Sequence, residues 1–182
     1  MPMMNSKPAR SRRQRGAAMM EVLVTMLIIA FGMLGFVGLQ AQSTLSQVEA
    51  YQRTQALILL NDMAQRITLN HTNAASYVAT SIGTTDPGDC TIGATLAARD
   101  VCEWSLLIQG STETQGSAKL GAVTAARGCI TAISATQYRV SLAWQGVQAS
   151  GAPAATCGQD TYASENTRRA VTTVVSLATL GT

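Results

Sequence analysis

The hydrophobic pattern of this 182-residue chain changes twice and divides it into three parts. Residues 1–16 are polar and basic, without a recurring apolar position. Residues 22–39 are almost wholly apolar, and no charged side chain occurs in residues 22–48. This stretch approaches the roughly 20 residues that a membrane-spanning helix needs. We therefore expect a transmembrane segment over residues 17–39.

Beyond Leu39 apolar side chains recur at steps of three and four residues, the pattern of a helix with one buried face. Glu49 with Arg53, and Asp62 with Arg66, are spaced for ion pairs along this helix. No proline or glycine interrupts residues 39–70. The pattern predicts one helix over residues 17–70, apolar all round in its first half. In its second half the apolar face comprises Leu45, Val48, Gln52, Ala56, Leu59, Leu60, Met63 and Ile67.

Residues 71–182 are predicted to form a globular head. Alternation over residues 138–145 predicts a strand, and residues 128–134 and 171–177 predict two more. Residues 146–166 are polar and indicate a tethered loop. The pattern of residues 95–107 predicts a helix, with Leu96, Cys102 and Leu106 on its buried side. A long helix packed on an antiparallel sheet is an α+β fold.

Charge is scarce and unevenly placed. Charged residues make up 13% of the chain, against about 25% in soluble domains. The net charge of +3 arises before Gly16, where there is no acid. A basic segment beside an apolar span stays on the cytoplasmic side of the membrane. The head has no basic stripe, so we expect no nucleic-acid partner. The basic residues are Lys7, Arg10, Arg12, Arg13 and Arg15.

The apolar segment is predicted to stay in the mature protein. A secretory signal peptide has a shorter apolar region, with small residues at a cleavage site after it. Here Gly16, Ala17 and Ala18 come before the apolar stretch. One acid, Glu21, lies within this segment, where a charge costs on the order of 3 kcal/mol. Either it has a partner in the membrane, or it lies at the helix end among lipid headgroups.

Four cysteines lie in the C-terminal half, and they allow three disulfide connectivities. Cys90 and Cys102 flank a short turn-to-helix segment, whereas Cys129 opens a predicted strand and Cys157 lies in the predicted loop. We expect Cys90–Cys102 and Cys129–Cys157, with crossed pairs as the alternative. Four thiolates also suffice for an all-cysteine zinc site, although exported proteins favour disulfides.

Catalytic groupings are not evident, and we expect a non-enzyme without a cofactor or a metal. His71 is the single histidine, and its position at the expected helix end favours a solvated or capping role. No Ser–His or Cys–His arrangement suggests a nucleophile. Asp86 with Asp89, and Asp100 with Glu103, are the acids that could seed a calcium site. Turn and helix-surface roles are commoner for such acids.

Arg15-Gly16, a short gap, Glu21 and then an apolar helix resemble the processing site of type IV prepilins. The resemblance implies that a prepilin peptidase cuts after Gly16 and methylates Ala17. It also implies that Glu21 pairs with the amino terminus of a neighbouring subunit during assembly. Ala17 and Met19 depart from the Phe and the Ser or Thr that the family usually has there.

The likeness extends to minor pilins called type IV pilus modification protein PilV. It is strong over residues 15–70 and patchy beyond. In the stem the similar segments are residues 21–24, 29–35 and 61–66. In the head they are Asp100 with Trp104, residues 128–130, residues 140–144, and Arg168 with Arg169.

This resemblance implies a pilin-like fold: a cytoplasmic leader, residues 1–16, that is removed; a long helix, residues 17–70; and a periplasmic head, residues 71–182. It implies a minor pilin that primes pilus assembly at or near the tip and supports adhesion and twitching motility. The implied partners are the prepilin peptidase, other minor pilins, the major pilin, a tip adhesin and the inner membrane. Two alternatives stay open: a pseudopilin of a type II secretion system, and a membrane-tethered binding module.

Overall fold

The computed structural model describes residues 14–91, 95–110, 114–116, 118–119 and 123–178. Most of the predicted leader, residues 1–13, lies outside the described residues. By its internal contacts the chain divides into two units, Met1–Leu45 and Ser46–Thr182. Helix α1, Gln14–Leu69, contributes its first part to one unit and its second part to the other. It begins three residues before the predicted start at residue 17.

The first unit consists, where described, of the apolar part of α1. Every side chain from Ala18 to Thr44 is exposed in the described structure. Among the described residues, α1 is the one helix that is long and apolar enough to cross a membrane. This part of α1 therefore has the length and composition of a single membrane anchor.

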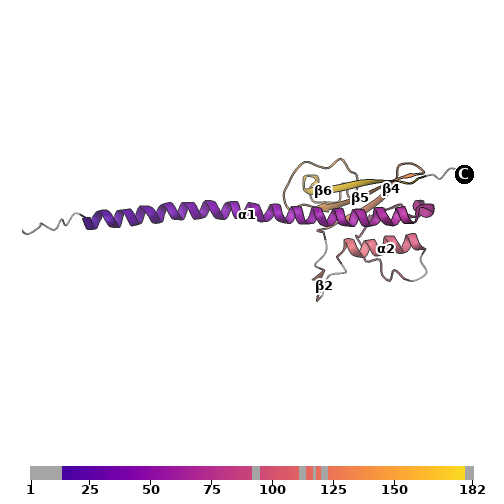
Figure 1. The fold of residues 1–182 in the computed structure, drawn as a ribbon, viewed down its shortest axis with the longest axis horizontal. Helices are drawn as coiled ribbons and strands as arrows, with labels where there is room; N and C mark the ends of the chain where they lie inside the picture. Colours follow the sequence, from indigo (N-terminus) through magenta and orange to yellow (C-terminus); the bar gives the residue numbers. More distant parts are fainter. Residues whose placement is uncertain (1–13, 92–94, 111–113, 117, 120–122, 179–182) are drawn as a thin grey trace, which may run out of the picture. The chain divides into compact units, whose positions relative to one another are not determined.

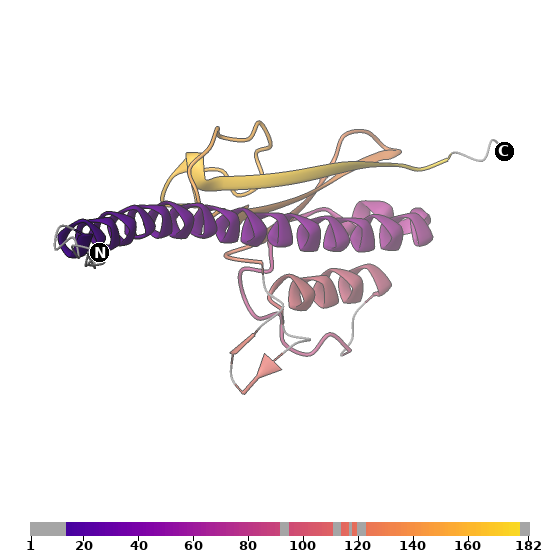
Figure 2. The same cartoon turned by 60° about the vertical axis from the view of Figure 1, so that its left-hand side comes forward.

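The second unit is an α+β head, as the sequence predicts. A four-stranded antiparallel sheet has the strand order β1-β4-β5-β6. Two short strands, β2 and β3, pair separately. Figures 1 and 2 show the second part of α1 running between this sheet and α2. After α1 the elements are η1 (His71–Tyr77), β1 (Ala79–Ile82), α2 (Leu96–Ile108), β2 (Thr114–Gln115), β3 (Ala118–Lys119), β4 (Arg127–Ala132), β5 (Gln137–Gln145), η2 (Glu165–Thr167) and β6 (Arg168–Ser176).

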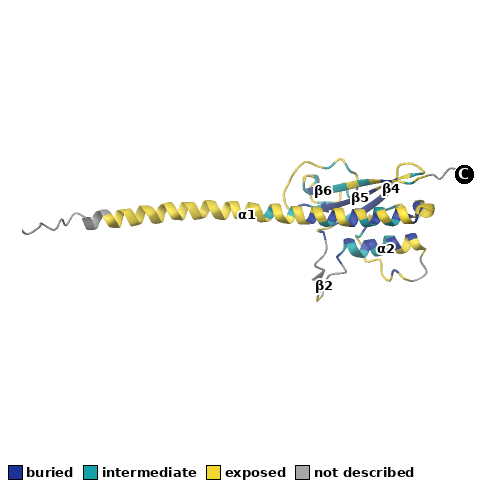
Figure 3. Cartoon of the chain, viewed as in Figure 1, coloured by how far each residue is buried: buried dark blue, intermediate teal, exposed yellow. Residues whose placement is uncertain are grey.

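One face of α1 forms the centre of the hydrophobic core. The buried face begins at Gln52, because Val48 remains 40% exposed and Leu45 is half-buried. The blue stripe along the second part of α1 in Figure 3 marks this face. On β5 the alternate residues predicted to point inward are all buried. The core cluster includes Ala56, Leu60, Met63 and Ile67 of α1 and Tyr138, Val140, Leu142 and Trp144 of β5.

The predicted buried side of α2 is wrong. Leu96 is 51% exposed, and the buried side instead centres on Trp104, which is fully buried. The indole Nε1 of Trp104 donates a hydrogen bond to the Leu59 carbonyl at 2.9 Å. The indole fixes the rotation of α2, because it has both the largest surface to bury and a polar group that needs a partner. Its companions on the buried side are Ala97, Asp100, Ser105 and Ile108.

A glycine on β4 makes room for this indole. A Cβ placed on Gly128 would lie 2.2 Å from a ring carbon of Trp104, which is far inside van der Waals contact. The sheet and α2 can approach each other here only because the position has no side chain.

Gly128→Ala should therefore destabilise the head by about 1–3 kcal/mol through overpacking. Gly151→Ala is the matched control, since a Cβ at Gly151 meets nothing within 4 Å. Thermal unfolding of both variants in the full mature chain measures the difference. Equal unfolding midpoints for the two variants would contradict the close contact between Gly128 and Trp104.

Candidate functional site

Glu21 is the acid that the sequence singles out, and the structure places it inside a regular helix. It lies seven residues after Gln14, the first residue of α1. Gly16 and Ala17 lie in the first turn of the same helix. Residues four apart share a helix face, so the Ala17 and Glu21 positions lie on the same side of α1. Within the described part of the chain, Glu21 makes no ion pair.

The helix around Glu21 presents a continuous apolar surface that is exposed in the described part of the chain. Its large side chains between Met19 and Leu39 are all more than half exposed. An exposed apolar surface of this size requires lipid or another protein to cover it. At Gly32, Gly35 and Gly38 a Cβ would meet nothing within 4 Å, so a neighbouring helix could approach the backbone closely. The surface thus suits lipid and apolar helices, and Glu21 is its one charge.

In the head, a charged cluster joins α1 to α2. Arg66 contacts Asp62 at 2.9 Å, Asp100 at 3.0 Å and Glu103 at 2.7 Å. Burial opposes the charge on Arg66, but the three carboxylates outweigh it and raise the pKa of the guanidinium. Tyr77 donates a hydrogen bond to Asp100 at 2.5 Å, and burial together with this carboxylate raises the pKa of Tyr77 to about 12. The cluster fixes α2 and η1 on α1.

This arrangement accounts for the acids considered as calcium ligands. Asp100 and Glu103 bind Arg66, while Asp86 and Asp89 accept hydrogen bonds from the backbone N–H groups of Gly88 and Thr91. Across the described residues, no three cysteine, histidine or acidic side chains are grouped so that they could hold a metal ion.

Two adjacent arginines on β6 tether the long loop between β5 and η2. Arg168 is only 2% exposed and donates hydrogen bonds to the carbonyls of Pro153, Ala155 and Cys157. It also pairs with Glu165 at 2.6 Å. A buried guanidinium needs several acceptors, and the loop supplies three. Sequence reasoning noted Arg168 only through the family resemblance.

Arg169 pairs with Glu49 of α1 at 3.1 Å. The expected pairing of Glu49 with Arg53 is therefore wrong: no such ion pair occurs among the described residues, and Glu49 turns toward β6. Its carboxylate also accepts hydrogen bonds from the backbone N–H groups of Val147 and Gln148, both at 3.1 Å. Desolvation opposes the charge, but these hydrogen bonds and Arg169 outweigh it and lower the pKa of Glu49. The expected pair of Asp62 with Arg66 does form.

Two disulfides, Cys90–Cys102 and Cys129–Cys157, have Cα separations of 5.5 and 5.8 Å. They are the pairs that the sequence favours over crossed pairing. All four thiols are used, which leaves no thiolate for a zinc ion.

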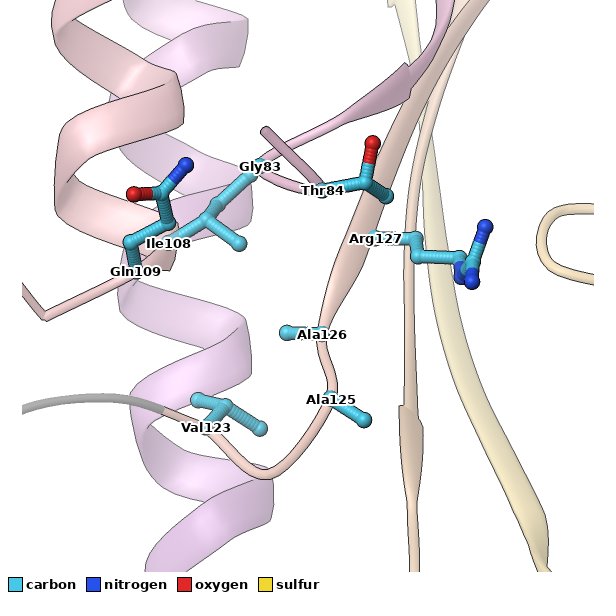
Figure 4. Close-up of a pocket in the computed structure, with 8 residues that line it drawn as sticks. All are labelled: Gly83, Thr84, Ile108, Gln109, Val123, Ala125, Ala126 and Arg127. Atoms are coloured by element: carbon cyan, nitrogen blue, oxygen red, sulfur yellow. The ribbon is translucent and has the colours of Figure 1, made fainter. Parts of the chain in front are cut away.

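A cavity of about 370 Å³ opens between the end of α2 and the segment before β4 (Figure 4). No acidic, histidine or cysteine side chain is among the described residues that line it. Its one charged residue, Arg127, points away from the cavity and lies over the Tyr162 ring, 5.9 Å from the ring centre. His71 is exposed at the start of η1. Among the cavity's described lining residues, Thr84 carries the one hydroxyl group.

Comparison of the chain with protein-family models, curated proteins and solved structures found no match. Its function is therefore inferred from its own residues and their geometry.

The pKa of Glu49 makes its contribution to stability depend on pH. A carboxyl whose pKa is lowered by folding stabilises the fold above its ordinary value of 4.5, and this stabilisation is lost as the pH falls through the lowered value. Glu49→Gln should reduce the free energy of unfolding by about 1 kcal/mol at pH 7 and by less at pH 3. Denaturant unfolding at the two pH values measures both effects.

Arg53→Gln is the control for this experiment. Because Glu49 binds Arg169 and not Arg53, the Arg53 variant should unfold like the parent protein at both pH values. A loss in the Glu49 variant that is equal at pH 7 and pH 3 would contradict the role of its charge.

Proposed function

We propose that this chain is a minor type IV pilin, a structural subunit and not an enzyme. A prepilin peptidase removes residues 1–16 and methylates Ala17. The mature chain is held in the inner membrane by α1, with the head in the periplasm, and is then built into the pilus fibre. There it helps to prime assembly at or near the tip and supports adhesion and twitching motility. Its partners are other minor pilins, the major pilin and a tip adhesin.

The observation that carries this proposal is a single acid that follows an Arg-Gly pair and precedes a long uncharged stretch of α1. Glu21 is followed by 27 uncharged residues before the next charge at Glu49. A carboxylate in lipid needs a partner to offset its desolvation, and cleavage at Gly16 creates a new cation, the amine of Ala17. The amine of a neighbouring subunit can then neutralise Glu21 when two such helices pack together.

The head supports the proposal through its chemistry. Two disulfides suit the oxidising periplasm, and the basic leader suits the cytoplasmic side of the membrane. The second part of α1 forms the centre of the head's core, so the anchor and the head share one helix. A pseudopilin of a secretion system would have the same features, and the experiments below separate the two.

The first prediction concerns processing. The native mature protein should begin at an N-methylated Ala17, because the leader precedes an apolar helix that stays in the protein. Gly16→Leu should leave full-length precursor in the inner membrane, since a side chain at this position obstructs the peptidase. Mass spectrometry of the purified protein measures cleavage, methylation and both disulfides together.

Ala9→Leu, which enlarges a leader residue away from the cleavage site, is the control and should be processed normally. A native protein that begins near residue 40 would instead indicate a conventional signal peptidase and would overturn the pilin proposal.

The second prediction concerns assembly. Glu21→Ala should be cleaved and inserted normally, yet it should be strongly depleted from sheared pili. Removing the acid leaves a neighbour's amine unpaired in lipid, which is unfavourable. Immunoblots of membrane and sheared-fibre fractions measure the distribution of the protein.

Thr25→Ala is the matched control, because Thr25 lies one turn further along the helix and its hydroxyl bonds only to its own helix, at the Val22 carbonyl. Normal recovery of the Glu21 variant in fibres would contradict the pairing. Loss of protein secretion with intact pili in a strain lacking this protein would favour the secretion pseudopilin.

A further inference from the structure

The face of the sheet that points away from α1 carries several hydroxyl groups, and Arg139 lies among them. Across the strands, Cys129, Ser141 and Thr172 form one row, and Thr131, Arg139 and Val174 form the next. These are the positions between the inward-facing residues of β4, β5 and β6. In a half-buried sheet this face meets water, and polar residues are expected there.

The tethered loop covers part of this face and borders a half-open cavity. Figure 1 shows the loop between β5 and β6 rising on the side of the sheet opposite α1. Between residues 154–161 of the loop and the sheet lies a cavity of about 560 Å³. This volume is within the range of about 300–1,000 Å³ that is usual for small-molecule sites. Ser141 is buried beneath the loop, although it belongs to the outward face.

The lining of the cavity combines polar and apolar surface in similar amounts, and most of its side chains are polar. The polar ones are five threonines, two serines, one glutamine and one arginine, and the others are two alanines, Gly158 and the Cys129–Cys157 disulfide. Hydroxyl groups both donate and accept hydrogen bonds, so this lining matches a ligand that is itself rich in hydroxyl groups.

The described lining of the cavity has one positive charge, on Arg139, which is free to bind an anionic ligand. Arg139 is exposed and forms no ion pair among the described residues, unlike Arg66, Arg168 and Arg169. None of the described lining residues is acidic. A guanidinium without a carboxylate partner binds carboxylate and phosphate groups through paired hydrogen bonds.

The walls of the cavity are held in place before any ligand arrives. The disulfide joins the loop to β4, and the buried Arg168 binds three loop carbonyls. A site that is already ordered loses less conformational entropy on binding.

From these observations we propose that the cavity between the loop and the sheet binds an acidic saccharide. Arg139 binds the carboxylate or phosphate of the ligand, and the serine and threonine hydroxyls bind its ring hydroxyls. This inference does not depend on incorporation into a pilus, since it concerns the head alone.

The test is a binding titration of the full mature chain in a detergent without sugar or phosphate groups. The probes are galacturonate, galactose 6-phosphate, galactose, acetate and inorganic phosphate, each followed by NMR or calorimetry. At least one acidic sugar should bind at least tenfold more tightly than galactose and than the free anions. Whether galacturonate or galactose 6-phosphate binds identifies the anionic group. Equal binding of galactose, binding of free anions alone, or no binding would each overturn the proposal.

Three variants test the assignment. Arg139→Gln should weaken binding of the acidic sugar about tenfold without changing the unfolding midpoint, because Arg139 is exposed and its charge is lost. Thr172→Val, which removes one lining hydroxyl, should weaken binding about fivefold. Arg53→Gln, the same change at another exposed arginine outside the cavity, should leave binding unchanged. Equal effects of the two arginine variants, or parental binding by the Arg139 variant, would contradict the site.

Discussion

Burial of one face of α1 is the interaction on which the head depends. The inner face of the sheet covers this face from one side and α2 covers it from the other, so the two layers share a single core. Fully burying Leu60, Met63 or Ile67 contributes about 1.5–3 kcal/mol each. Hydrogen bonds at the edges of this face fix the position of α1 relative to its neighbours. Trp104 donates a hydrogen bond to the Leu59 carbonyl, and Gln52 donates one to Thr124. Sheet and helix therefore keep their positions through α1.

The strongest periodic signals predicted the fold well. The uncharged run from Val22 and the three- and four-residue steps after it identify α1. The alternation from Tyr138 identifies β5. Each pattern is long enough to distinguish the helical repeat from the two-residue repeat of a strand. The buried side of α2 was mispredicted, although Ala97, Trp104 and Ile108 share one side at helical spacing. Strand β1 and helix η1 were not anticipated, since segments this short carry little periodicity and owe their structure to pairing with β4 and packing on α2.

Long-range charge pairs were beyond the reach of sequence reasoning. Glu49 has an oppositely charged residue four positions away, yet it binds Arg169, which is 120 residues distant in the chain. The half-buried guanidinium of Arg169 would be poorly compensated without Glu49, whereas Arg53 is exposed and fully hydrated. Gly16, Ala17 and Glu21 could be proposed from the sequence because their pattern is local. The cavity around Arg139 could not, because its lining combines β1, β4, β5, β6 and the loop.

Neither disulfide includes a residue of α1. The covalent cross-links therefore brace the loops of the head, while side-chain contacts and the short backbone connection through η1 join the head to the helix. A pull along α1 would load those contacts in shear. The Arg66 cluster, the Trp104 hydrogen bond and the Glu49–Arg169 pair would resist sliding of the helix. Oxidation protects the head against loop opening, but its resistance to mechanical extraction of the helix is set by packing. A head of this design would yield to a pull along α1 by slippage of the helix, with both cross-linked loops still intact.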